Sequence, residues 1–182
     1  MFSSLSRLFR PSPLAESVRR LYAAIVGQSR MPAFYARWGV PDTPTGRFEM
    51  MALHGFLILH RLKGESKAIE LGQAFSEAIV SDIDRNVREL GTGDLRVGTE
   101  VRHLTQVLYG RFAEYDEGLE TGAAALGEVL ACNLYAKAAP TPEQNSAMVA
   151  YIRREVASLA GQPLAELSRG EVSFGPAPLE AA

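Results

Sequence analysis

The feature that most constrains the fold is a segment that is apolar on almost every side. Residues 47–63 read RFEMMALHGFLILHRLK, and helical spacing spreads their apolar side chains nearly all the way round the axis. Such a helix must be covered by neighbours on several sides, so we predict a central, buried helix here. It is shorter than the roughly 20 apolar residues of a membrane span and carries charges at both ends. The alternative is that part of its surface, with Met50 and Met51, stays open for an apolar client.

The segments before and after this helix have the spacing of amphipathic helices. Apolar residues recur at steps of three and four, and neither strand-like alternation nor a hairpin turn occurs along the chain. A length of 182 residues suits one domain with a sizeable core. We therefore predict an all-α, single-domain bundle of about six to seven helices. The expected helices cover residues 13–28, 31–38, 47–63, 67–90, 101–119, 121–138 and 141–161.

Proline and glycine divide the chain into three parts. A Pro-Ser-Pro sequence separates an N-terminal segment, residues 1–12, from a helical domain at residues 13–169. The last part, residues 170–182, is rich in glycine and proline, and we predict a flexible C-terminal tail there.

The N-terminal segment is basic and amphipathic. On a helix its apolar residues fall near one side with two arginines beside them, which is typical of segments that rest on a membrane surface. A frayed chain end is an equally supported alternative. The residues expected to contact a membrane are Phe2, Leu5, Arg7, Leu8, Phe9 and Arg10.

Charge is unevenly distributed along the chain, although the net charge is only −2. Residues 1–40 hold six arginines and one acid, whereas residues 114–182 hold ten acids and four bases. The basic end can contact anionic lipid or ribosomal RNA, while the acidic remainder discourages wrapping on a polyanion, so we expect no DNA partner. We find no secretory signal and no stretch of membrane-spanning length. These features predict a cytoplasmic protein, with the inner-membrane surface as a candidate contact.

Enzyme and metal chemistry have little support in the sequence. There is no GxSxG motif, and GTGDLRVG lacks the lysine of a phosphate-binding loop. Cys132 is the only cysteine, which excludes an intramolecular disulfide and a cysteine-rich zinc site. Glu100 and His103 form one Glu-x-x-His element, whereas a di-iron bundle needs two. We therefore expect no enzyme activity, no metal and no cofactor, with a metal- or haem-binding bundle as the disfavoured alternative.

A charged helix end and a glycine-flanked turn occupy residues 81–98, SDIDRNVRELGTGDLRVG. Asp84 faces Arg88 at the i,i+4 spacing of a helix. Arg85 faces Glu89 in the same way, so these charges can pair locally. The glycines that follow suit a helix C-terminus and a tight turn. Spacing alone therefore indicates an exposed, self-paired helix end.

Four separated blocks of sequence resemble the ubiquinol–cytochrome c chaperone family. They are DxDRxxRELGxGDxxVG at 82–98, YGR at 109–111, YDEGL at 115–119 and YARWGVPDTPTGRFEMMALHGFLILHRL at 35–62. Several blocks in the right order are far more specific than one short motif. Members of this family are all-helical assembly factors for cytochrome b of the respiratory bc1 complex. The resemblance therefore implies a non-enzymatic chaperone that shields newly made cytochrome b until haem insertion and subunit joining.

The resemblance also selects candidate client-binding residues. Arginine and tyrosine are typical anchors where proteins meet, and a polar rim beside apolar helix surface suits a site that holds a membrane-protein segment. In the turn VPDTPTG a rigid structural corner is the alternative explanation, and Gly46 belongs to the same block. The candidate client-binding residues are Arg85, Arg88, Glu89, Asp94, Tyr109, Arg111, Tyr115, Asp42, Arg47 and Phe56.

The resemblance leaves the remaining partners open. In mitochondria the family works with a small partner subunit and near the exit of the ribosome. Neither partner follows for this chain from its residues, and a peripheral position on the inner membrane rests on the N-terminal segment alone. A helical interaction module that holds no client, whose charged turn only caps helices, is the main alternative function.

Overall fold

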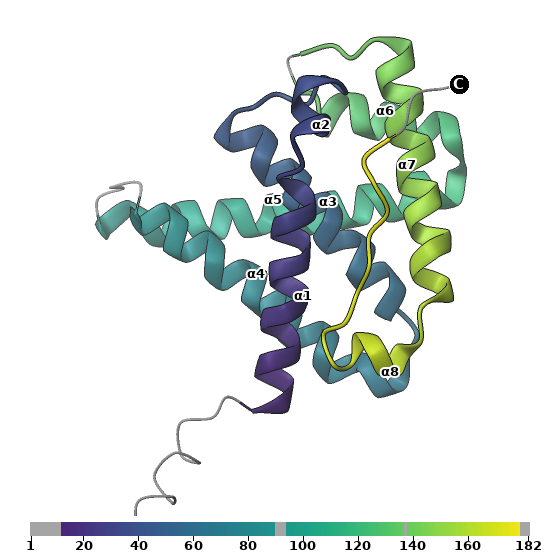
Figure 1. Ribbon diagram of the computed structural model, residues 1–182. Helices are drawn as coiled ribbons and strands as arrows, with labels where there is room; N and C mark the ends of the chain where they lie inside the picture. Colours follow the sequence, from purple (N-terminus) through teal and green to yellow (C-terminus); the bar gives the residue numbers. More distant parts are fainter. Residues whose placement is uncertain (1–11, 90–93, 137, 179–182) are drawn as a thin grey trace, which may run out of the picture.

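The computed structural model describes residues 12–89, 94–136 and 138–178 (Figure 1). These residues form eight α-helices and one 3₁₀ turn and contain no strand. The predicted all-α, single-domain bundle is confirmed. The elements are α1 (Pro13–Ser29), α2 (Pro32–Ala36), α3 (Pro44–Leu62), η1 (Ser66–Ala68), α4 (Ile69–Glu89), α5 (Asp94–Thr121), α6 (Ala123–Asn133), α7 (Pro142–Gly161) and α8 (Leu164–Leu167).

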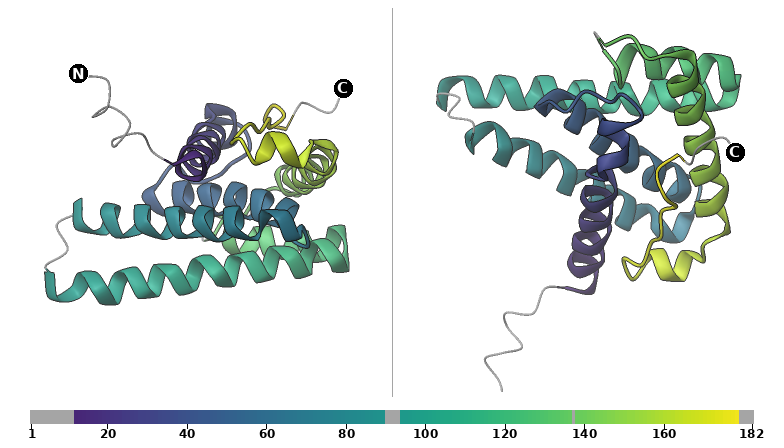
Figure 2. Two further views of the ribbon diagram at one scale, coloured as in Figure 1. Left: turned by 90° about the horizontal axis from the view of Figure 1, so that it is seen from below. Right: turned by 45° about the horizontal axis from the view of Figure 1, so that its top comes forward.

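Helix α3 lies at the centre of the bundle, as its apolar pattern predicts. Eleven of its 19 residues are buried, and α1, α4, α5 and α7 all pack against it. Its start is fixed locally, because the Thr43 hydroxyl accepts a hydrogen bond from the Gly46 amide at 3.1 Å and Pro44 follows the cap. Seen from below, α3 and α4 form a middle layer with α1 on one side and α5 on the other (Figure 2, left).

Helices α4 and α5 form an antiparallel pair whose joined ends project beyond the other helices (Figures 1 and 2). Helix α5 ends at Thr121 because Gly122 has a φ of 130°, which interrupts the helix before α6 begins. Helix α6 stops at Asn133, earlier than the predicted residue 138, and Ala136 has a left-handed φ of 47°. The expected helix at 121–138 is therefore shorter at both ends, and α8 was not expected from the periodicity.

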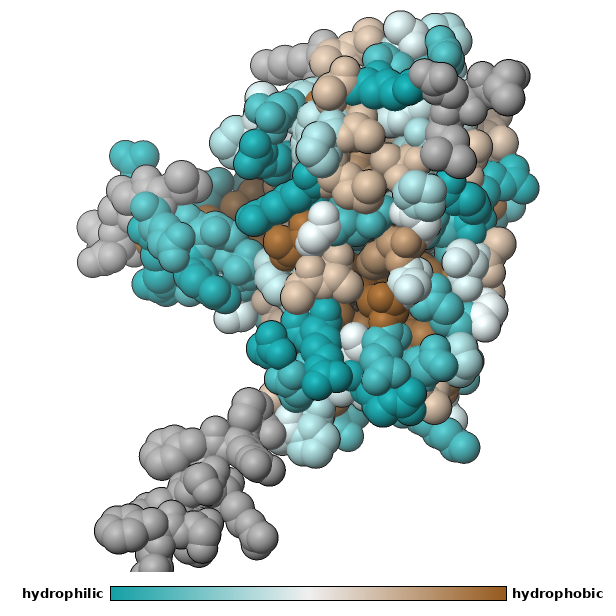
Figure 3. Space-filling view, in the orientation of Figure 1, coloured by the Kyte–Doolittle hydropathy of each residue, from teal (hydrophilic) through white to brown (hydrophobic). Residues whose placement is uncertain are grey.

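Residues 170–178 run as an extended strap between α1 and α7 (Figure 1). Gln28 donates a hydrogen bond to the Gly175 carbonyl at 2.7 Å, and the Gly175 amide donates to the carboxylate of Glu155 at 2.8 Å. The indole nitrogen of Trp38 donates to the Pro178 carbonyl at 2.9 Å. Figure 3 shows hydrophobic surface in this region, framed by hydrophilic side chains. The sequence predicts a flexible tail from residue 170 onward, and that prediction contains none of these contacts.

A chain of hydrogen bonds crosses the core from α1 to α3. Gln28 donates to the Tyr151 hydroxyl at 3.0 Å, and that hydroxyl lies 2.7 Å from Nε2 of His54. Nδ1 of His54 lies 2.8 Å from the carbonyl of Met50, which can only accept. His54 therefore carries its proton on Nδ1 and accepts from Tyr151, as a neutral imidazole. Its complete burial lowers the pKa of His54 to about 4.

The stability of the folded protein should decrease as the pH is lowered, because His54 is buried in its neutral form. The unfolded chain takes up a proton at His54 near pH 6.5, whereas the folded protein does so only near pH 4. Between these values the unfolded state binds more protons, so lowering the pH through this window removes about 3 kcal/mol of stability. Urea unfolding of the wild type and of His54→Gln at pH 7 and pH 5 measures the effect. Parallel losses in the two proteins would contradict the prediction.

Candidate functional site

Two large hydrophobic side chains stand out on the surface of the described residues because they are exposed. Ile69, the first residue of α4, is 68% exposed, and Tyr109 on α5 is 49% exposed. The Tyr109 hydroxyl lies 2.8 Å from the hydroxyl of Ser76 on α4, and its ring meets that of Phe112 at 5.9 Å. Ile69 therefore lies near the end of α3, and Tyr109 lies between α4 and α5, against Phe112.

This region contains a groove, which we call the α3–α5 groove. It consists of a hollow of about 470 Å³ between α3, η1 and α4 and a neighbouring hollow of about 250 Å³ between α3 and α5. Leu59 and Lys63 line both hollows, so the two hollows are neighbours on the surface. A volume of this size accommodates several apolar side chains. The groove is lined chiefly by Phe56, Leu59, Leu62, Ile69, Gly72, Phe112 and Ala113.

Charged side chains frame the groove where α3 ends. The Lys63 ammonium lies 2.5 Å from one carboxylate oxygen of Asp116, and Nδ1 of His60 lies 2.9 Å from the other. The hydrogen bond from Lys63 is the main cause that lowers the pKa of Asp116 below its usual range. Glu65, on the other side of the groove, pairs with Arg61 at 3.0 Å. The arrangement is an apolar floor with an ionised rim.

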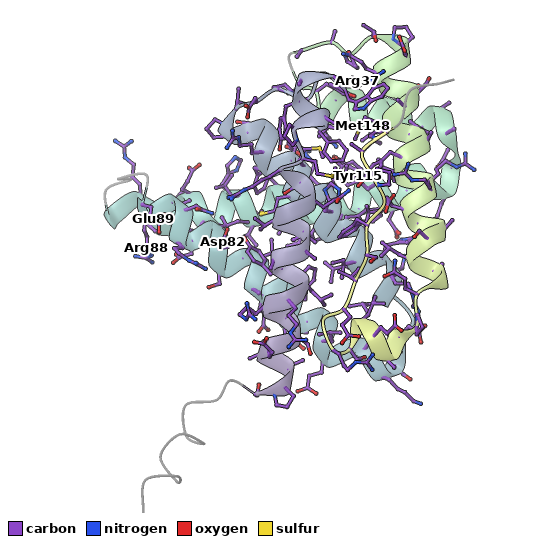
Figure 4. The ribbon with its side chains drawn as sticks, in the orientation of Figure 1. Arg37, Asp82, Arg88, Glu89, Tyr115 and Met148 are labelled. Atoms are coloured by element: carbon purple, nitrogen blue, oxygen red, sulfur yellow. The ribbon has the colours of Figure 1, made fainter. Side chains whose placement is uncertain are left out.

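The charged end of α4 lies away from this groove. Figure 4 shows Arg88 and Glu89 on the projecting part of the helix, far from Tyr115 in the middle of the molecule. The expected pair between Asp84 and Arg88 is present at 2.7 Å. Arg85 lies 3.3 Å from the carboxylate of Asp82, one turn before it in the helix, whereas its expected partner Glu89 lies one turn after it. Helix α5 begins at Asp94, and the glycine turn before it lies outside the described residues.

Arg111 belongs to an ion pair that joins α5 to α3. Its guanidinium lies 3.0 Å from the carboxylate of Glu49, which is only 3% exposed, and 3.3 Å from that of Glu114. Burial raises the pKa of Glu49, and the hydrogen bonds from Arg111 oppose that shift. Arg111 therefore neutralises a buried charge.

Tyr115 and Phe56 are core residues in this structure. Tyr115 has no exposed surface, and its ring lies 5.5 Å from that of Phe56, which is 3% exposed. Burial raises the pKa of the Tyr115 phenol. Phe56 still contributes to the floor of the α3–α5 groove, whereas Tyr115 lies behind it.

Asp42 and Arg47 form an exposed ion pair of 2.7 Å at the start of α3. They lie beside Gly46, whose position explains the tight turn. A Cβ atom at Gly46 would come within 2.0 Å of the carbonyl oxygen of Pro41. The turn therefore requires glycine for close backbone approach, which supports the structural explanation of this block. The structure does not bring Asp42 and Arg47 into the α3–α5 groove.

Sequence reasoning missed several groove residues. Leu59 is one of many apolar residues in the block at 35–62, and Ala113 lies between two blocks, so neither is distinguished by the resemblance. Asp116 stands in the block YDEGL, from which the candidate set takes only Tyr115. Adjacent residues of a helix point in directions about 100° apart, so Asp116 faces the groove while Tyr115 faces the core.

The described residues contain neither a membrane span nor a cluster of metal ligands. The expected membrane-contact residues at 2–10 lie outside the described residues. Among the helices that the structure does describe, none combines the length and apolarity of a bilayer span. Over the same residues, no three histidine, cysteine or acidic side chains are grouped so that they could hold a metal ion.

Replacing Gly46 by alanine should destabilise the protein. The new Cβ would collide with the Pro41 carbonyl, and relieving such a clash typically costs about 1–3 kcal/mol. The matched control is Gly110→Ala within α5, where no atom lies within 4 Å of the added carbon. That variant should gain about 0.5–1 kcal/mol. Thermal unfolding of both variants measures the difference, and equal melting temperatures would refute the steric account.

Replacing Arg111 by alanine should cost far more stability than replacing Arg47. The first change leaves the buried carboxylate of Glu49 unpaired, a loss of about 3 kcal/mol. The second breaks an exposed pair, so little change is expected. Adding Glu49→Gln to Arg111→Ala should recover part of the loss, because the unpaired charge is removed. Urea unfolding tests the series, and similar losses for Arg111→Ala and Arg47→Ala would contradict it.

Comparison with known proteins finds relatives that carry the same name. Ubiquinol-cytochrome-c reductase complex assembly factor 1 of Xenopus laevis is 27% identical over 164 residues, covering 86% of this chain and 80% of the frog protein. The human and mouse proteins of that name are each 26% identical over 164 residues, and this chain spans about half of their length (53% and 54%).

A solved structure supports the same relationship. The crystal structure of the Cbp3 homolog from Brucella abortus matches with a TM-score of 0.79 and 34% sequence identity, over 95% of this chain and 97% of that chain. Residues 36–174 match the family model described as Ubiquinol-cytochrome C chaperone. Because that match covers most of the chain, the protein belongs to the ubiquinol-cytochrome C chaperone family.

Proposed function

We propose that this protein is an assembly chaperone of the ubiquinol–cytochrome c reductase complex that holds newly made cytochrome b through the α3–α5 groove. The family membership and the names of the relatives support a role in assembly of this complex. The mechanism is non-covalent. Binding keeps the apolar surface of the client away from water and from other chains until the other subunits of the complex cover it.

The observation that carries this proposal is the exposed apolar surface around the groove. Exposed apolar side chains that gather around a hollow can mark a place where a partner binds. Here exposed Ile69 lines one hollow together with Leu59, and exposed Tyr109 packs on Phe112, which lines the other hollow with Phe56. An apolar groove with a polar rim is a common design for holding a helix of another protein.

The main client-binding surface proposed is the α3–α5 groove and not the charged end of α4. Of the candidate residues, Phe56 lines the groove and Tyr109 contacts the lining residue Phe112, while Lys63 and Asp116 supply the charged edge. Arg88 and Glu89 lie on the projecting end of α4 (Figure 4), and Arg85 belongs to the same last turns of the helix. There they offer a second contact for the same client or for a partner subunit. Contact of residues 1–10 with the inner membrane, and a position near the ribosome, remain predictions.

The test uses a strain that lacks this protein. We expect a several-fold loss of the b-type haem signal of the complex in reduced-minus-oxidised spectra of its membranes, with a parallel loss of ubiquinol–cytochrome c reductase activity. The wild-type gene should restore both. Ala113→Glu and Ile69→Glu place a charge at the apolar groove and should not restore them, because burying an unpaired charge against the client is unfavourable.

Ala157→Glu is the matched control, since Ala157 is an exposed alanine on α7. It should restore signal and activity as the wild type does. Western blots establish that all variants accumulate equally. An unchanged spectrum in the deletion strain, under conditions that require the complex, would refute the assembly role. Full restoration by both groove variants would refute the role of the groove.

A further inference from the structure

The walls of the α3–α5 groove differ in charge from its floor. Residues 113–120 of α5 contain four acids and no base. Asp116 lines the groove, Glu117 and Glu120 are exposed on the next turn, and Glu114 is turned toward Arg111. The α5 wall therefore changes from apolar near Ala113 to acidic one turn later.

The opposite side of the groove carries one acid among its lining residues. Glu65 lies there and pairs with Arg61 at 3.0 Å. Lys63, between the two walls, is already paired with Asp116 at 2.5 Å, and Glu120 also acts on it electrostatically. These two ion pairs each cancel in charge, so the exposed side chains of Glu117 and Glu120 leave the α5 side of the rim negative.

We propose that the groove recognises the end of an apolar client helix that carries lysine or arginine directly after its apolar stretch. The apolar part would lie over Leu59 and Phe112, and the basic residues would lie beside Glu117 and Glu120. This inference rests on the proposed chaperone function and specifies which part of a membrane protein the groove takes. Electrostatic complementarity of this kind sets the orientation of a bound segment and excludes segments with the wrong charge.

Membrane-protein helices have this composition at one end only. Their cytoplasmic flanks are enriched in lysine and arginine, whereas acidic residues contribute little to that asymmetry. A groove with an acidic rim therefore selects the cytoplasmic end of a client helix over its opposite end. The chaperone would bind the client from the side on which it is made, and would release it when the helix end is covered by lipid or by another subunit.

Binding of model peptides to the full-length protein tests this inference. The probe is a 16-residue leucine–alanine peptide with a fluorescent label and a non-ionic solubilising tag at one end, and with Lys-Lys or Glu-Glu at the other. We expect the lysine peptide to bind about tenfold more tightly at low salt, since two weak ion pairs of roughly 0.7 kcal/mol each add to about 1.4 kcal/mol. The preference should shrink in 0.5 M salt, where exposed charges are screened.

Charge reversal locates the effect. The double variant Glu117→Lys/Glu120→Lys should abolish or invert the preference, and Glu143→Lys/Glu166→Lys, two exposed acids on α7 and α8, should keep it. Equal binding of the two peptides to the wild type would overturn the inference, as would an undiminished preference in Glu117→Lys/Glu120→Lys. Because the peptides require no cytochrome b, these outcomes are separate from the spectra of the deletion strain. A normal spectrum there would overturn the assembly role without altering the peptide preference.

Discussion

Covering α3 on all sides is the constraint on which the rest of the structure depends. A helix that is apolar almost all the way round is destabilised wherever water reaches it. Four helices, α1, α4, α5 and α7, contact α3, and both clusters of buried hydrophobic residues include residues from it. Because these four helices come from both halves of the chain, the halves cannot form separate cores, and the bundle is one domain.

Polar groups on α3 add direction to this apolar packing. Glu49 and His54 are both buried, and each is satisfied by a side chain from a different helix, Arg111 of α5 and Tyr151 of α7. Hydrophobic contact depends little on direction, whereas a buried carboxylate or imidazole left without its partner is costly. The two contacts therefore favour one rotation of α3 relative to α5 and α7.

The sequence was most informative where the interactions are local. Helical periodicity predicted α1 to α7, and the i,i+4 rule predicted an ion pair near the end of α4. The sequence pattern could not predict that Arg111 pairs with Glu49, 62 residues away, because that contact depends on the packing of α5 against α3. The candidate residues do not all lie together in the structure, for a related reason. Sequence blocks combine neighbours such as Tyr115 and Asp116, which point to the core and to the groove respectively.

The groove arises where the covering of α3 is incomplete. At the end of α3, Lys63 and Gly64 turn the chain away into η1 and α4, and the space between α3, η1 and α4 stays hollow. Leu59 is partly exposed there, although Leu62, three residues later, is buried. The apolar pattern that draws four helices around α3 thus leaves Leu59 incompletely covered. A client helix in the groove would extend the packing of the bundle, which requires no rearrangement of its core.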